Sequence, residues 1–296
     1  MRNTFAKTCF EIQNSDLNSV VLLGDIGVHA FRKSFELYPE RTYNIGILEQ
    51  AMVGIASGLA LKGFKPILHT IAPFLVERAL EQIKIDFAYQ KLSATFVSVG
   101  GSFDYAALGA THHCPADINL MGSIPGTNIY IPGTAQEMQQ QLHAAQSTQG
   151  VKYIRMSEKV NTEEHLQNGN SASKIQNGST ATVLVTGPLV DDCLEQLKGM
   201  DIEIVYFNNL STDTLIKVRN LTTTKKAIVV APFYGEFLHS ILNSVFESSN
   251  VMVSNCSVQP DIHHTYGDVT QHLVQAGVAG DSLRCRILAK IESRLN

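Results

Sequence analysis

A single carboxylate, Glu49, begins a stretch of small and apolar residues in this sequence. Ile45, Ile47 and Leu48 precede it, and residues 51–61 are mostly Ala, Gly, Val, Ile and Leu. Burying an ionised carboxylate without a partner is costly. An acid at the start of such a helix therefore indicates a functional role for this carboxylate. The alternative is an exposed glutamate that is favoured there by the helix dipole.

Other polar and aromatic residues follow predicted strands. They are Asp25 after residues 19–23, Phe74 after residues 65–71, His112 and His113 in the Gly-containing loop that starts at residue 100, and Arg155 in the strand 151–156. Parallel sheets bind their ligands at the carboxyl ends of the strands. We therefore expect one acid, one aromatic ring, a loop with histidines and one arginine to line a single cleft.

The elements that would position these residues alternate between strand and helix. Strands are expected at 19–25, 65–71, 94–100, 128–133 and 151–156, and helices at 46–63, 73–91, 116–124 and 134–146. This alternation predicts an α/β fold with a mostly parallel sheet that is covered by helices on both faces.

A second α/β block follows a change in composition. Residues 158–178 are polar and rich in Asn, Ser and Gly, which is typical of a linker. Strands are then expected at 180–187, 202–208, 226–232 and 251–256, and helices at 188–197, 212–221, 235–247 and 281–295. The sequence therefore predicts two α/β domains, over 1–157 and 179–296, joined by the linker 158–178.

Composition excludes several classes of protein. The chain has 296 residues, 44% of them hydrophobic and 17% charged, with a net charge of −4 and no basic run. These values favour a cytoplasmic globular protein that binds neither nucleic acid nor membrane. The five cysteines include no CxxC pair, and the segment THHCP (111–115) lacks the spacing of metal ligands, so no metal site is predicted.

Several segments together resemble a known family. The segment RTYNIGILEQAMVGIASGLAL (41–61) is similar to the pyrimidine-binding domain of thiamine-diphosphate enzymes in the transketolase and deoxyxylulose-phosphate synthase group. GDIG after the first strand, TIAPF with RALEQIKID, GATH and YIR follow in the family's order, and residues 179–296 resemble its C-terminal domain. The resemblance implies transfer of a two-carbon unit from a ketose or 2-oxo acid to an aldehyde, with thiamine diphosphate as cofactor.

One part of the family pattern is absent. Full-length members begin with a domain that holds the diphosphate and Mg²⁺ and carries GDG followed by NN, and this chain has no GDG. The resemblance therefore implies a split enzyme in which a partner subunit carries that domain, with two copies of each chain. Two alternatives stay open: the beta subunit of a 2-oxo-acid dehydrogenase decarboxylating component, and a non-catalytic module that binds a complete enzyme.

The resemblance gives Glu49 a catalytic role. A carboxylic acid that is hydrogen-bonded to a pyrimidine ring nitrogen favours the imino tautomer of the cofactor, and this imine removes the thiazolium proton. Such an acid must share or donate a proton near neutral pH. We expect Ile45, Ile47 and Leu48 to favour its protonated form by desolvation, and we expect Ile47 and Glu49 to contact the cofactor.

Other residues match cofactor positions of the family. Phe74 matches an aromatic residue that stacks on the aminopyrimidine, although a core phenylalanine at a strand–helix junction explains it as well. Asp25 matches an acid near the thiazolium, or it caps the turn after a strand. Arg78 and Asp86, on the helix expected over 73–91, are expected to have a structural or subunit-contact role.

The remaining matches concern the substrate. His112 matches the histidine of a G-x-T-H loop that contacts the reacting oxygens and shuttles protons, and His113 stands beside it. Arg155 matches an arginine that reaches substrate phosphate; a loop histidine and a surface arginine are the alternatives. Leu108 stands where sugar-using transketolases carry Asp. We therefore expect a donor other than the usual ketose phosphates.

Overall fold

The computed structural model describes residues 1–167 and 169–293 of the chain. These residues form two compact units. Unit 1 consists of Met1–Gly101 and Leu120–Glu158, and unit 2 consists of Ser102–Asn119 and the described residues from Lys159 onward. The loop Ser102–Asn119 therefore belongs to unit 2, although the sequence predicts it within the first domain. No helix in the described part of the chain is long and apolar enough to cross a membrane.

Unit 1 is built on one parallel sheet. Its strands are β1 (Ser19–Leu23), β2 (Thr42–Asn44), β3 (Lys65–Ile71), β4 (Ala94–Val99), β5 (Asn128–Tyr130) and β6 (Val151–Arg155). They lie in the order β2-β1-β3-β4-β6-β5, and every neighbouring pair is parallel. The carboxyl ends of all six strands consequently lie at one edge of the sheet, as the predicted α/β fold requires.

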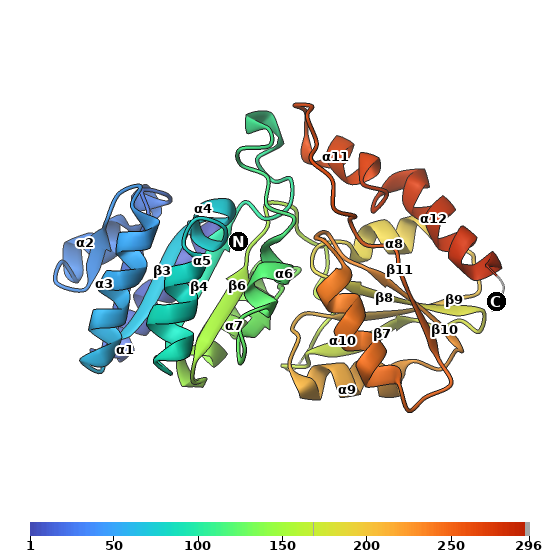
Figure 1. Ribbon diagram of the computed structural model, residues 1–296, viewed down its shortest axis with the longest axis horizontal. Helices are drawn as coiled ribbons and strands as arrows, with labels where there is room; N and C mark the ends of the chain where they lie inside the picture. Colours follow the sequence, from blue (N-terminus) through green and yellow to red (C-terminus); the bar gives the residue numbers. More distant parts are fainter. Residues whose placement is uncertain (168, 294–296) are drawn as a thin grey trace. The chain divides into compact units, whose positions relative to one another are not determined.

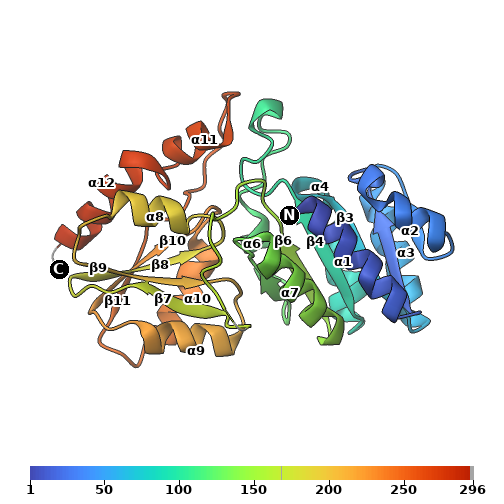
Figure 2. The same ribbon diagram turned by 180° about the vertical axis from the view of Figure 1, so that it is seen from behind.

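Helices cover both faces of this sheet. The helical segments are α1 (Arg2–Ser15), η1 (Val28–Phe31), α2 (Arg32–Leu37), α3 (Glu49–Leu61), α4 (Ala72–Val76), α5 (Leu80–Gln82), η2 (Ile83–Tyr89) and α7 (Ala135–Ser147). The helices α3, α4 and α5 lie in front of the sheet in Figure 1, whereas α1 and α7 lie in front of it when the molecule is seen from behind in Figure 2. Short helices η3 (Ala106–Leu108) and α6 (Asp117–Gly122) follow β4.

The continuous helix predicted over 73–91 is wrong. Residues 77–79 form a turn between α4 and α5, and η2 has π-helical hydrogen bonding. The backbone N–H of Arg78 donates to the carbonyl of Pro73 at 3.1 Å, five residues earlier. Such wide turns within helices are frequent at functional sites.

Unit 2 contains a second, mostly parallel sheet. Its strands are β7 (Ala172–Gln176), β8 (Ala181–Thr186), β9 (Ile202–Phe207), β10 (Lys226–Val230) and β11 (Met252–Asn255), in the order β11-β10-β8-β9-β7. Only the edge strand β7 is antiparallel to its neighbour. The linker predicted over 158–178 is thus wrong for residues 172–176, and residue 168 within it lies outside the described residues.

Polar residues hold β7 in the sheet, which explains why its sequence looks like a linker. Lys174 of β7 forms an ion pair with Glu203 of β9, whose side chain is buried. The Thr182 hydroxyl donates to the same carboxylate at 2.7 Å, and Thr223 does so at 2.6 Å. Because these hydrogen bonds satisfy the buried charge, the strand needs few apolar side chains.

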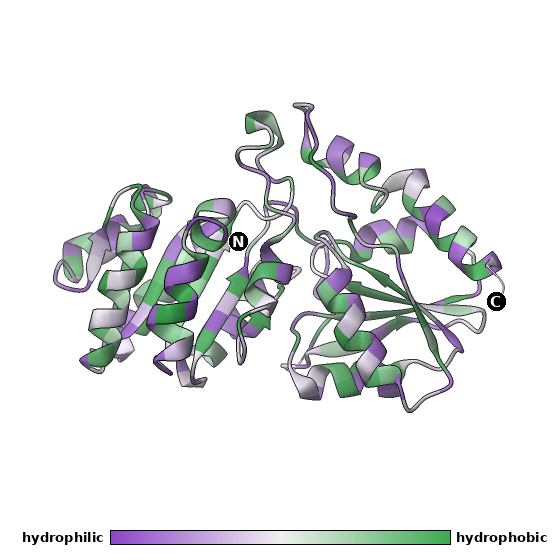
Figure 3. Ribbon diagram, viewed as in Figure 1, coloured by the Kyte–Doolittle hydropathy of each residue, from purple (hydrophilic) through white to green (hydrophobic). Residues whose placement is uncertain are grey.

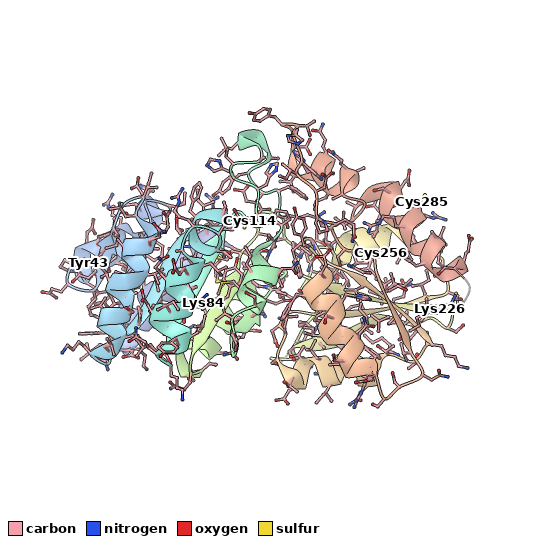
Figure 4. The ribbon with its side chains drawn as sticks, viewed as in Figure 1. Tyr43, Lys84, Cys114, Lys226, Cys256 and Cys285 are labelled. Carbon is pink, nitrogen blue, oxygen red and sulfur yellow. The ribbon has the colours of Figure 1, made fainter. Side chains whose placement is uncertain are left out.

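The helices of unit 2 are α8 (Val190–Gln196), α9 (Thr212–Leu221), α10 (Glu236–Phe246), α11 (Val269–Gln275) and α12 (Gly280–Glu292). Helices α9 and α10 pack on one face of the sheet, and α8 and α12 pack on the other. The central strands β8, β9 and β10 of this sheet are mostly hydrophobic (Figure 3). Cys256 is buried beside the sheet, whereas Cys285 is exposed on α12 (Figure 4). The end of the helix predicted over 281–295 lies outside the described residues.

We predict that Gly178→Ala lowers the free energy of unfolding by about 1–3 kcal/mol, measured by urea denaturation. A Cβ at Gly178 would lie 2.2 Å from the carbonyl carbon of Ile202, and backbone cannot move aside cheaply. Gly58→Ala in α3 is the matched control, because its Cβ would meet nothing within 4 Å. Equal stability of the two variants would show that the close approach of Gly178, between β7 and β8, to Ile202 does not require glycine at this position.

Candidate active site

Glu49 lies at the carboxyl-terminal edge of the unit 1 sheet, as the first residue of α3. The strand β2 ends at Asn44, and Gly46 then adopts a left-handed conformation with φ of +82°, which turns the chain into the helix. Glycine adopts this conformation without strain. The turn directs the Glu49 side chain inward, where none of its surface is exposed.

Two side chains contact the buried carboxylate. Nη1 of Arg78 donates to Oε2 of Glu49 at 2.6 Å, and the Thr70 hydroxyl lies 3.2 Å from Oε1. Thr70 stands at the end of β3 and also lies 3.3 Å from the carbonyl oxygen of Gly24. Glu49 is therefore ion-paired and hydrogen-bonded, which is the usual condition for a charge in a protein interior.

The apolar setting expected for Glu49 is different in the structure. Ile47 is 65% exposed and Leu48 is 61% exposed, so these two side chains do not bury the carboxylate. They precede α3, which begins at Glu49 and buries Glu49 together with Met52, Val53, Ala56 and Ser57. The predicted desolvation by these two neighbours is wrong, while contact of Ile47 with a cofactor stays a prediction.

Phe74 shares a partner with Glu49. Phe74 is the third residue of α4 and is half-buried, and Arg78 follows it by four residues. The Arg78 guanidinium carbon lies 4.2 Å from the centroid of the Phe74 ring, which is a cation–π contact. One guanidinium therefore contacts both the acid and the aromatic ring that the sequence singles out.

Asp25 lies after β1 at the same edge and faces Asn44. It adopts a left-handed conformation with φ of 57°, and its carboxylate accepts a hydrogen bond from the Asn44 amide at 2.9 Å. The Asn44 oxygen accepts in return from the Asp25 backbone N–H at 3.0 Å. These bonds join the ends of β1 and β2 and leave the Asp25 side chain exposed.

Arg155 ends β6 and is 1% exposed, so it is not a surface arginine. Its Nη1 donates to the Ser157 hydroxyl at 3.0 Å. A Cβ at Gly101 would lie 2.6 Å from the guanidinium carbon, so a larger residue at this position would require the Arg155 guanidinium to shift. Gly101 is therefore part of the surroundings of Arg155. The two glycines that follow β4 in the sequence are the signal that could have identified this contact.

His112 and His113 belong to unit 2 and have different surroundings there. His112 is half-buried, with its Nδ1 at 2.9 Å from the Thr111 hydroxyl. His113 is buried, and its ring meets the Phe103 ring edge-on at a centroid distance of 5.2 Å. Leu108 is half exposed in the same loop. The side chain of His112 is thus the more accessible of the two.

Phe103 is the centre of a cluster of imidazole rings. His263 stacks on it at 4.5 Å and His272 at 5.3 Å between centroids, and Nδ1 of His263 lies 2.9 Å from Nδ1 of His272. Burial and the neighbouring His272 and His263 lower the pKa of His113 to about 4. Burial likewise lowers the pKa of both His263 and His272. This cluster holds the loop that carries His112 onto unit 2.

Sequence reasoning missed the partners of the predicted residues. Thr70, Asn44 and Gly101 were not singled out, and Arg78 was given only a structural or contact role. The spacing of Phe74 and Arg78, which corresponds to one helical turn, is the signal that could have joined them. Within the part of the chain that the structure describes, no group of three or more His, Cys, Asp or Glu side chains could hold a metal ion.

We predict that the free energy of unfolding falls as the pH is lowered from 6.5 toward 4. Burial also lowers the pKa of His69 to about 4, although its Nδ1 donates to the Val97 carbonyl. Since His69 and His113 stay neutral in the folded state while the unfolded chain takes up protons near pH 6.5, their stabilisation is complete above that pH. Each of these two histidines should contribute roughly 1–3 kcal/mol to the fall in the free energy of unfolding.

Urea denaturation of the chain at pH 7.5, 6 and 5 measures this slope. His69→Gln and His113→Gln should each reduce the difference in unfolding free energy between pH 7.5 and pH 5, whatever their effect at pH 7.5. The interpretation is wrong if both variants keep the full difference.

The comparisons with known proteins agree with one another. The family model described as "Transketolase, pyrimidine binding domain" matches residues 1–162. An uncharacterized 33.6 kDa protein in the fasciation locus of Rhodococcoides fascians is 34% identical over 258 residues, which are 86% of this chain and 83% of that protein.

Two further similar proteins are described as transketolases. One subunit of the apulose-4-phosphate transketolase of Actinobacillus succinogenes is 36% identical over 128 residues, which are 43% of this chain and 41% of that subunit. A solved structure described as a split gene transketolase, inactive beta4 tetramer, has a TM-score of 0.81 at 22% identity and covers 98% of this chain and 97% of its own. The structural likeness shows that the fold is shared.

Proposed function

We propose, since this chain belongs to the family of the transketolase pyrimidine-binding domain, that it is the C-terminal subunit of a split transketolase-like enzyme that uses thiamine diphosphate. In this proposal unit 1 binds the aminopyrimidine, and unit 2, which includes β7, corresponds to the C-terminal domain. The enzyme transfers a two-carbon unit from a ketose or 2-oxo acid to an aldehyde. The likeness to one subunit of a transketolase supports the division into two chains.

The observation that carries the proposal is the buried carboxylate of Glu49, which shares its partner Arg78 with the ring of Phe74. An aminopyrimidine needs an acid at one ring nitrogen and an aromatic surface against its plane. Arg78 shows that a planar, positively charged group can meet both at once, at 2.6 Å from Glu49 and 4.2 Å from the Phe74 ring centroid. The residues at this edge of the sheet therefore fit the pyrimidine part of the cofactor.

Each residue then has a separate task. Bound thiamine diphosphate supplies the stabilisation of a carbanion. Oε2 of Glu49 holds or donates a proton, while the Thr70 hydroxyl fixes Oε1 at 3.2 Å and so limits the rotation of the carboxyl group. The Phe74 ring orients the bound group. His112 exchanges a proton with the substrate oxygens, and Arg155 binds a substrate phosphate through its guanidinium fork.

The partner subunit is part of the proposal. Exposed apolar side chains gather in one segment of unit 1, at Tyr43, Ile47, Leu48, Ile55 and Leu61. Exposed apolar side chains are frequent at interaction sites. We assign it to the subunit that holds the diphosphate and Mg²⁺, in an assembly with two copies of each chain. A structural neighbour described as an inactive beta4 tetramer supports a need for a second type of chain.

We predict that Glu49→Gln lowers the kcat of the assembled enzyme by at least about 100-fold. The amide is nearly isosteric but cannot exchange a proton as the carboxyl does. Activity is measured after assembly with the partner subunit, and size-exclusion chromatography with light scattering checks that the assembly forms. Wild-type activity in an intact Glu49→Gln assembly would remove the catalytic assignment.

The donor is predicted to differ from the usual ketose phosphates. Leu108 places a side chain without hydrogen-bonding groups in the loop before His112, and specificity built on hydrogen bonds changes by large factors when one partner is lost. A panel of ketose phosphates, modified sugars and 2-oxo acids is compared by kcat/KM, with the wild-type assembly and with Leu108→Asp. Xylulose 5-phosphate as the best donor of the wild type would show that this prediction is wrong.

A further inference from the structure

We propose that Arg78 occupies the pyrimidine site in the chain without cofactor, where it neutralises Glu49. Arg78 leaves this site when the aminopyrimidine binds. This inference rests on the proposed function. It assigns Arg78 to the cofactor site itself, whereas its place in the sequence indicates only a structural or contact role.

The first argument is that Arg78 uses the same two groups that the cofactor needs. Its Nη1 donates to Oε2 of Glu49 at 2.6 Å, and its guanidinium carbon lies 4.2 Å from the centre of the Phe74 ring. A second planar group cannot lie in that position at the same time. The aminopyrimidine and the guanidinium therefore compete for one place.

The second argument comes from charge. The Glu49 side chain has no exposed surface, and removing the partner of a buried charge is strongly destabilising. The chain must fold before it meets its cofactor, so the carboxylate needs a cation from the protein at that stage. Arginine suits this role because its guanidinium is planar, stacks on aromatic rings and donates hydrogen bonds in a fixed geometry.

The third argument is that Arg78 can leave without disturbing the core. It lies in the turn 77–79 between α4 and α5, and its side chain is 39% exposed, although its partner is fully buried. The side chain can thus rotate toward solvent about its own bonds. Thr70, on β3, stays in place and continues to hold Oε1 of Glu49.

The test is the affinity of the assembled enzyme for thiamine diphosphate with Mg²⁺, measured by isothermal titration calorimetry in the absence of substrate. Arg78→Met keeps a long side chain and removes the competing guanidinium. The apparent dissociation constant should fall about tenfold, as expected if Arg78 fills the site for nine-tenths of the time. Arg78→Lys should lower it by a smaller factor, because an ammonium pairs with Glu49 but has no planar face.

Arg32→Met is the matched control. It removes another arginine–glutamate pair of unit 1, in which Nε of Arg32 lies 2.8 Å from Glu36 in an exposed position, and it should leave the dissociation constant unchanged. In the isolated chain, Arg78→Met should lower the urea midpoint of unfolding, and Glu49→Gln combined with Arg78→Met should restore most of it. This second measurement tests the charge argument without cofactor.

The outcomes separate the two proposals. An unchanged or higher dissociation constant for both Arg78 variants, while the wild type binds, overturns the role of Arg78 and leaves the proposed function intact. If Arg78→Met does not fold, the dissociation constant of Arg78→Lys decides. If neither the wild-type assembly nor the variants bind thiamine diphosphate, the proposed function is overturned.

Discussion

The burial of the Glu49 carboxylate at the edge of the unit 1 sheet is the constraint around which the candidate site is built. A carboxylate without exposed surface needs a charged partner and a hydrogen-bond donor, and the fold supplies them from two directions. The end of β3 contributes Thr70, and the wide turn after α4 contributes Arg78. The parallel sheet makes this arrangement possible because it collects the carboxyl ends of its strands at one edge.

Much of this fold follows from sequence patterns, and the exceptions have physical reasons. The strand expected at 65–71 and the helix expected at 212–221 are observed with the same bounds, because apolar periodicity determines them. The strand β7 was missed since a buried ion pair, rather than apolar alternation, holds it in the sheet. The helix α11 was also missed, although Asp268 and Gln271 form a capping box that its sequence shows.

In the candidate site, too, the sequence identifies which residues are candidates, whereas packing determines where their side chains point. The order of segments identifies Glu49, Phe74 and Arg155 as candidates. It does not reveal that Ile47 and Leu48 face outward, because the direction of a side chain depends on the residue at which α3 begins. Nor does it reveal that His113 is buried in a ring cluster around Phe103, because His263 and His272 are far away in the chain.

The assignment of Ser102–Asn119 to unit 2 has a consequence for how this chain can be divided. The polypeptide leaves unit 1 after β4, contributes Phe103 to the core of the other unit, and returns to complete its own sheet with β5 and β6. A fragment that stops at residue 158 would contain a full parallel sheet but would expose Phe103 to water. Unit 1 is therefore not one uninterrupted stretch of the chain, and a boundary placed at a single residue cannot separate the two units.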